Sequence, residues 1–299
     1  MAKKKKAKRA TGFKNTTDVT LSLPTTYKQL FKITYKTNLL LIFKISLMIT
    51  LFAIPLLLCL YIRTRIITGI SEASAAEDLS KNIMSFQGWY GFVLLAAFII
   101  FSIGVCGALY VMKKHIKNEG VIFMRDFFQG IKKNAFGTMG LTLFYFGILS
   151  ILNYFINLFY FESEIPYYPI LLVAFIIISI ILYMMWVISI SIYMTYTCPF
   201  FKLLKNSFLM MFAKLPLNLL SLVTTIAPFI IVWVIGFAPV LYGFTLAYVG
   251  IGFGNSILVI SLINCYIFDE LVNKKQFPEA YRKGLFNGEV NPTDEGFQK

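Results

Sequence analysis

The sequence predicts an all-α, polytopic transmembrane helical bundle of about six spans, and three observations lead to this prediction. Hydrophobic residues make up 58% of the 299-residue chain and charged residues only 14%, with a mean hydropathy of +0.73. These polar side chains are too few to cover a soluble protein of this size. Several apolar runs are long enough to cross about 30 Å of hydrocarbon. The Lys and Arg residues cluster between alternate runs.

Six apolar runs of roughly 20 residues or more are expected to span the membrane. They lie near residues 40–62, 89–112, 136–160, 168–196, 217–237 and 240–267. The last two are separated only by a very short turn at 237–243, FAPVLYG. If Pro239 merely kinks one long helix there, the chain has five spans and its C-terminus lies outside. On the six-span assignment the transmembrane domain covers residues 23–270 and is followed by a cytoplasmic C-terminal tail at 271–299.

The distribution of Lys and Arg predicts the orientation. On the six-span assignment the cytoplasmic segments hold 24 of the 28 Lys and Arg residues, and the external segments hold Arg63, Arg65 and Lys81. Cytoplasmic loops retain positive charge, so both termini are predicted to face the cytoplasm of a bacterial plasma membrane.

The N-terminal segment MAKKKKAKRA carries six Lys or Arg residues. With no apolar periodicity, residues 1–22 are predicted to form a disordered, basic cytoplasmic tail. Such a cluster is attracted to anionic lipid headgroups by about 1 kcal/mol per charge. Aromatic residues do not alternate with the cations as they do on a single-strand-binding surface, so no nucleic-acid partner is expected.

Amphipathic segments precede spans 1, 3 and 5, which predicts cytoplasmic helices after Pro24, over 121–135 and after Pro199. Positions placed 100° apart put Phe127 and Phe128 on one face of the second segment and the charged residues on the opposite face. Each segment is followed by a pair of spans. The pattern predicts three parallel units, each an entry helix followed by a transmembrane hairpin.

An amphipathic helix of this kind lies in the headgroup plane or docks on another protein. We expect the helix 121–135 to be the contact, with Arg125 and Asp126 as polar determinants and the two phenylalanines as anchors in the bilayer or the bundle. The alternative is that Arg125 and Asp126 only stabilise the fold of the loop. The candidate partner or lipid contacts are Arg125, Asp126, Phe127, Phe128, Lys132, Lys133, Lys205 and Asn206.

Two of these segments carry a family resemblance. The run IFMRDFFQGIKKN before one span and the run CPFFKLLKNSFLMMFAKLPLNLL before another resemble the YesL-like family of bacterial membrane proteins, a domain of unknown function. The resemblance covers roughly residues 35 to 270. It implies an association with carbohydrate-uptake systems of Gram-positive bacteria, and it brings no activity or catalytic residues with it.

On this assignment every Asp and Glu lies in a loop or a tail, and the single histidine, His115, lies at the end of the second span. Membrane enzymes and ion-coupled transporters place titratable groups along their spans. We therefore expect a protein that is not an enzyme, with no catalytic residue, no cofactor and no metal site.

Small residues recur at helical spacing in the last span, at Gly243, Ala247, Gly250 and Gly254. Such a face lets two membrane helices approach closely, so these positions are predicted to pack against another helix.

The features together predict an accessory or scaffold protein that supports a membrane transport system, such as an ABC uptake system, through its cytoplasmic amphipathic helices. The expected partners are membrane lipids and another membrane protein. The alternative is a permease-like subunit that moves a neutral solute, because amides such as Asn153, Asn157 and Asn264 in the predicted spans suit an uncharged cargo.

Overall fold

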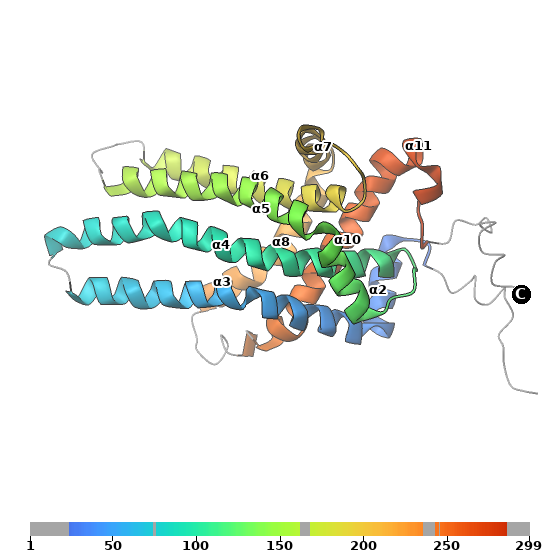
Figure 1. Ribbon diagram of the computed structural model, residues 1–299, viewed down its shortest axis with the longest axis horizontal. Helices are drawn as coiled ribbons and strands as arrows, with labels where there is room; N and C mark the ends of the chain where they lie inside the picture. The colour runs from blue at the N-terminus through green and yellow to red at the C-terminus, as the bar shows by residue number, and fades with distance from the viewer. Residues whose placement is uncertain (1–23, 74–75, 162–167, 236–242, 245, 286–299) are drawn as a thin grey trace, which may run out of the picture.

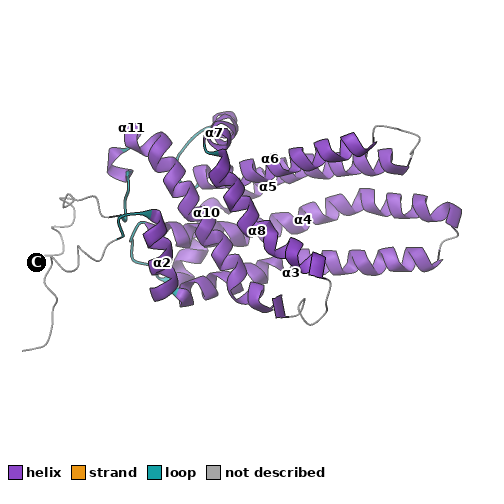
Figure 2. Ribbon diagram, turned by 180° about the vertical axis from the view of Figure 1, so that it is seen from behind, coloured by secondary structure: helices purple, strands orange, loops and turns teal. Residues whose placement is uncertain are grey.

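The computed structural model describes residues 24–73, 76–161, 168–235, 243–244 and 246–285 (Figure 1). All regular structure among these residues is helical, as Figure 2 shows, so the all-α prediction is confirmed. The predicted basic tail at 1–22 lies outside the described residues, as does most of the predicted turn at 237–243.

The chain folds into long helices joined by short connections. The helices are α2 Tyr27–Thr37, α3 Leu39–Ala73, α4 Ala76–Ile116, α5 Phe123–Phe161, α6 Tyr168–Tyr193, α7 Phe200–Ala213, α8 Leu215–Ile235, η1 Tyr248–Gly252, α10 Phe253–Phe268, η2 Asp269–Asn273, α11 Lys274–Gln276 and η3 Pro278–Ala280.

The bundle has two ends, a terminal end and a hairpin end. The terminal end holds α2, the loop 117–122 and the segment 269–285 (right in Figure 1). The hairpin end is where α3 gives way to α4 and α5 gives way to α6 (left in Figure 1).

Five helices of the described chain are long and apolar enough to cross a membrane, and α7 with α8 makes a sixth if this bent pair is one span. The protein is therefore a multi-pass membrane bundle of five to six spans. The Tyr248 hydroxyl lies 3.4 Å from the Thr225 carbonyl. One continuous helix would separate these residues by about 34 Å, so the chain reverses between α8 and η1.

The first hairpin is longer than predicted. The sequence predicts an external loop at 63–88, but α3 continues to Ala73 and α4 begins at Ala76. No proline interrupts this stretch, and hydroxyls bond back to the preceding turn, as Thr68 Oγ1 does to the Thr64 carbonyl at 2.9 Å. At 1.5 Å per residue the 35 residues of α3 extend about 52 Å, well beyond the hydrocarbon thickness.

The three predicted entry segments join their hairpins in different ways. α2 is a separate helix, because Asn38 leaves the helical conformation before α3 begins. The second segment, which begins at Phe123, is the first part of α5 and continues into the span without a break. α7 turns by 94° into α8, and Figure 1 shows it nearly end-on while α3 to α6 run lengthwise. The three units thus share an order of elements but not one geometry.

Helix α10 runs through the centre of the terminal half and contacts α2, α3, α4, α6 and α8. A Cβ atom at Gly254 would clash with the backbone carbonyl of Ile42 on α3, so glycine is needed at this crossing. Of the other predicted packing positions, a Cβ atom at Gly250 would lie 3.6 Å from the ring of Phe43 on α3, whereas one at Gly243 would meet no described atom within 4 Å, and Ala247 is exposed. Gly250 lies within the π-helical turn η1, which separates Ala247 from Gly254.

The outer surface of the bundle is apolar. Large hydrophobic side chains stand exposed along α3 and α6, among them Leu40, Leu51, Leu58, Ile170 and Val173. A soluble monomer rarely exposes so continuous an apolar surface, which is the expected face toward lipid.

Candidate functional site

The residues predicted as contacts fall into an exposed and a buried set. Arg125, Phe128, Lys132 and Lys133 are exposed near the start of α5. On α7, Lys205 is exposed and Asn206 is half-buried. Phe201 on α7 is 83% exposed. The start of α5 and helix α7 therefore present aromatic and basic side chains at the terminal half of the bundle.

Asp126 does not lie on the exposed polar face predicted for it. Its side chain is fully buried, where Oδ2 accepts from the backbone N–H of Ile122 at 2.8 Å and lies 3.1 Å from Lys114 Nζ. Arg125 Nε lies 3.6 Å from the other oxygen. The carboxylate satisfies a free N–H at the start of α5, where the helix dipole also favours a negative charge. Asp126 thus stabilises the loop, which is the alternative raised from the sequence.

Phe127 and Phe128 differ in burial. Phe127 is fully buried and packs against Phe52 of α3 and Phe123, with ring centroids about 6 Å apart. Phe128 is half exposed. Of the two predicted anchors, Phe127 therefore holds α5 in the bundle and Phe128 faces outward.

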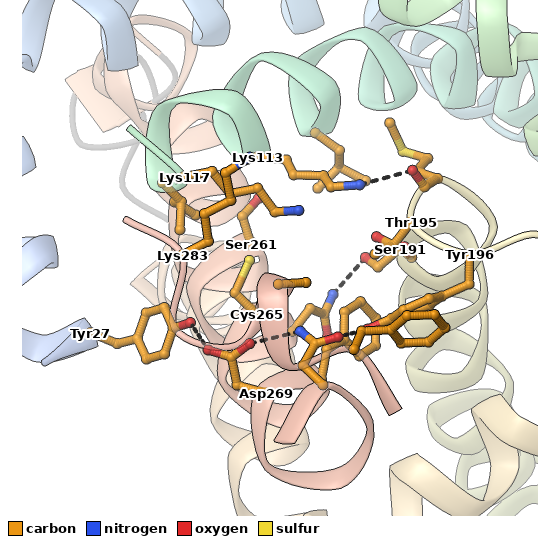
Figure 3. Close-up of a pocket in the computed structure, with 18 of the residues that line it drawn as sticks. Tyr27, Lys113, Lys117, Ser191, Thr195, Tyr196, Ser261, Cys265, Asp269 and Lys283 are labelled. Carbon is orange, nitrogen blue, oxygen red and sulfur yellow. Dashed lines mark hydrogen bonds between the residues drawn. The ribbon is translucent and has the colours of Figure 1, made fainter. Parts of the chain in front are cut away.

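A cavity of about 330 Å³ opens at the terminal end, and Figure 3 shows its lining. Its walls come from α2, the last turns of α4 and α6, α10 with η2, and the segment 277–283. Sequence reasoning missed this site, because the helices that form it are far apart in the chain.

Asp269 forms one wall of the cavity. The predicted last span ended at 267 and left this residue in a tail, but α10 continues through the π-helical turn η2 and leaves the Asp269 side chain buried. Its carboxylate accepts from the Tyr27 hydroxyl at 2.6 Å, from Asn273 Nδ2 at 2.7 Å and from the Arg282 backbone N–H at 2.9 Å. The expectation that every acid lies in a loop or tail is wrong for Asp126 and Asp269.

Three lysines line the opposite wall, as Figure 3 shows for Lys113, Lys117 and Lys283. Lys113 Nζ donates to the Met194 carbonyl at 2.9 Å. Lys283 Nζ lies 3.1 Å from Glu119 Oε1. Within the described part of the chain, no carboxylate lies within 4.0 Å of the Lys117 ammonium.

Hydroxyl and amide groups lie between these two walls. Asn264 Nδ2 donates to Ser191 Oγ at 2.7 Å, which fixes α10 against α6. The Ser261 hydroxyl is buried and has no hydrogen-bond partner among the described residues. Cys265 lies between Ser261 and Asp269 (Figure 3).

Two tyrosines outside the apolar spans complete the lining. Burial raises the pKa of Tyr27 above its ordinary value, and Cys265 and Asp269 raise it further. Burial and the nearby Asp269 likewise raise the pKa of Tyr196, whose hydroxyl donates to Asn273 Oδ1 at 2.6 Å. Both phenols therefore stay protonated at neutral pH and act as hydrogen-bond donors.

One sequence signal points to this site in retrospect. Ser261, Cys265 and Asp269 are spaced four residues apart, which places them on one face of a helix. Within the described chain, no group of three or more His, Cys, Asp or Glu side chains could hold a metal ion. What the cavity offers is ammonium and hydroxyl donors, which suit binding of a polar or anionic ligand.

No family model matches the chain, and neither a curated protein nor a solved structure matches it.

Proposed function

We propose that this multi-pass protein is a non-enzymatic accessory subunit of a transport system in a bacterial plasma membrane. Its terminal end faces the cytoplasm, where most of the Lys and Arg residues lie. It contacts a membrane partner through α7 and the start of α5. The resemblance to the YesL-like family makes a carbohydrate-uptake system the first partner to test.

The geometry of α7 is the observation that carries this proposal. The helix is turned by 94° from α8, so it crosses the bundle rather than running along it. It exposes Phe201 together with Lys202 and Lys205. Leu203, Ser207 and Met211 form the buried face of α7, which packs mainly against α6, whereas Phe201 and the two lysines are exposed and available to a partner.

Site-specific photo-crosslinking in native membranes tests the contact. A photoreactive residue at Phe201 or Phe128 is expected to form a discrete protein adduct. The same residue at Ile170, which is 67% exposed at the hairpin end, is expected to react with lipid alone. Lipid adducts at all three positions would contradict a protein partner and leave α7 as a helix of the headgroup plane.

A second test links the contact to transport. The double variant Phe201→Ala, Lys205→Ala is expected to lose the crosslinked partner while it still purifies as a monodisperse protein. Uptake of a labelled carbohydrate by cells that carry this variant is expected to fall as far as in cells that lack the protein. Unchanged uptake in both strains would refute the role in that system.

The cavity favours a second candidate function, a permease-like subunit. Ligand sites in helical bundles lie between helices, where a few polar side chains fix the ligand. The lysines on the wall favour a negatively charged solute over the neutral solute expected from the sequence. Flux of a labelled anion into proteoliposomes that contain only this protein would support this function against the accessory role.

A further inference from the structure

We propose that the terminal-end cavity binds a phosphate group through Lys113, Lys117 and Ser261, carried either by an anionic lipid headgroup or by a soluble phosphate compound. This site is independent of the contact through α7, and its test does not depend on that partner.

Positive charge gathers on the α4 side of the cavity. Lys113 and Lys117 stand four residues apart at the end of α4, so two ammonium groups lie on one helix face. Like charges at this spacing repel each other. Lys283 is already paired with Glu119, and the Asp269 carboxylate already accepts three hydrogen bonds. Glu279 of the segment 277–283 also lines the cavity, so the positive charge is concentrated on the α4 wall, at Lys113 and Lys117, rather than spread over the whole lining.

The cavity wall also holds an unsatisfied hydroxyl. Ser261 is only 5% exposed, and its Oγ has no partner among the described residues. A buried hydroxyl without a partner is unfavourable, so its presence at a cavity wall calls for a ligand or water. Figure 3 shows Ser261 on the same side of the cavity as Lys113 and Lys117. A bound acceptor near the two ammonium groups would also satisfy this hydroxyl.

The arrangement of donors favours phosphate among anions. A lysine ammonium binds phosphate as a compact point charge. A tetrahedral phosphate can accept from two ammonium groups and a hydroxyl that approach from different directions. Basic pockets between membrane helices on the cytoplasmic side hold phospholipid headgroups. The cavity of about 330 Å³ is also large enough for a small phosphate ester.

The experiment uses the full chain in detergent and in nanodiscs. Inorganic phosphate and glycerol 3-phosphate are titrated calorimetrically into the detergent-solubilised protein. Nanodiscs with equal amounts of phosphatidylglycerol and phosphatidylcholine are analysed by native mass spectrometry for the lipid that stays bound. Binding of the soluble compounds identifies a solute site, and selective retention of phosphatidylglycerol identifies a headgroup site; either result supports the proposal if it depends on Lys117.

Three variants make that dependence measurable. Lys117→Gln is expected to weaken binding about tenfold or more, because it removes one charge-assisted hydrogen bond. Lys117→Arg keeps the charge and is expected to retain most of the binding. The matched control Lys36→Gln removes an exposed lysine on α2 and is expected to change affinity by less than about twofold.

Ser261→Ala separates a ligand site from a merely structural cavity. Without ligand this variant is expected to be at least as stable as the wild type, because the hydroxyl has no partner to lose. Its affinity for the phosphate probe is expected to fall about fivefold. The proposal is overturned if none of the probes binds, if the cavity holds only water, or if Lys117→Gln folds and binds as the wild type does.

Discussion

The two ends of the bundle are held together by different forces. At the terminal end, side chains from distant parts of the chain meet in directional bonds. These bonds join Tyr27 to Asp269, Thr34 to His115, Tyr35 to Asn255, Lys113 to Met194 and Tyr196 to Asn273. At the hairpin end the helices meet through contacts such as the close approach of Gly88 on α4 to the ring of Tyr154 on α5.

The difference shows where the sequence specifies one arrangement of helices. In lipid, apolar faces gain little by packing against each other, so polar bonds and close backbone contacts determine which helices meet. The terminal end has both kinds of contact. Among the described residues the hairpin end has a bond from Ser150 Oγ to the Gly91 carbonyl at 3.0 Å and a cation–π contact between Arg63 and the ring of Tyr90. We expect the terminal end to open last and the hairpin end to open locally.

The largest effect is expected from Asp269→Ala, which removes a buried carboxylate at the terminal end. Three donors, the buried Asn273 and the half-buried Tyr27 and Arg282, lose their acceptor, so the free energy of unfolding should fall by about 3 kcal/mol or more. Denaturant unfolding in detergent measures it, and trypsin should cleave faster after Arg282 and Lys283. The exposed Glu72 at the hairpin end is the control, and Glu72→Ala should change stability by less than about 0.5 kcal/mol. Equal effects of the two changes would remove the contrast between the ends.

A slightly smaller effect is expected from Gly254→Ala at the crossing of α10 and α3. The added methyl group meets the Ile42 backbone, and such overpacking costs about 2 kcal/mol. The control is Gly140→Ala on α5, where an added methyl meets no described atom within 4 Å. That change should be neutral or stabilise the helix by up to about 1 kcal/mol. If both variants unfold at the same temperature, the close approach is not a determinant of the fold.

Tyr145→Phe tests a position between the two ends of the bundle. The buried Tyr145 hydroxyl bonds Ser189 Oγ at 2.7 Å and lies 3.4 Å from Ser207 Oγ, which links α5 to α6 and α7. Its loss should lower the free energy of unfolding by about 1 kcal/mol, measured by thermal unfolding in detergent. Tyr154→Phe removes a hydroxyl from an exposed tyrosine nearer the hairpin end and should have no measurable effect.

The smallest effect is expected from Ser150→Ala at the hairpin end. Removal of its bond to the Gly91 carbonyl should change global stability by no more than about 0.5 kcal/mol, since Ser150 Oγ also bonds within its own helix. Amide hydrogen exchange should nevertheless rise in the parts of α4 and α5 nearest the hairpin end and stay unchanged in α10. A rise in exchange at α10 would show that the two ends unfold as one unit.

Particular residues show which features of the fold and the site the sequence predicted correctly and which it did not. Apolar runs located the helices well, because hydrophobicity over about 20 residues is a local property. The loop predicted at 63–88 was wrong, since hydropathy marks the hydrocarbon and not the end of a helix. Asp126 was assigned to the polar face from its charge. Its carboxylate is instead buried, where it pairs with Lys114 and accepts a hydrogen bond from the Ile122 N–H. The contact roles of Lys205 and Asn206 stay predictions.

The sequence by itself determined that this chain is an all-α membrane bundle, because composition, hydropathy and charge distribution are properties of a linear chain. Only the tertiary structure decided where its polar groups meet. Tyr27, Lys117, Ser261 and Asp269 are separated by up to 242 positions, yet they line one cavity. Their chemistry arises from helix packing, which depends on bonds between distant residues that no local pattern records.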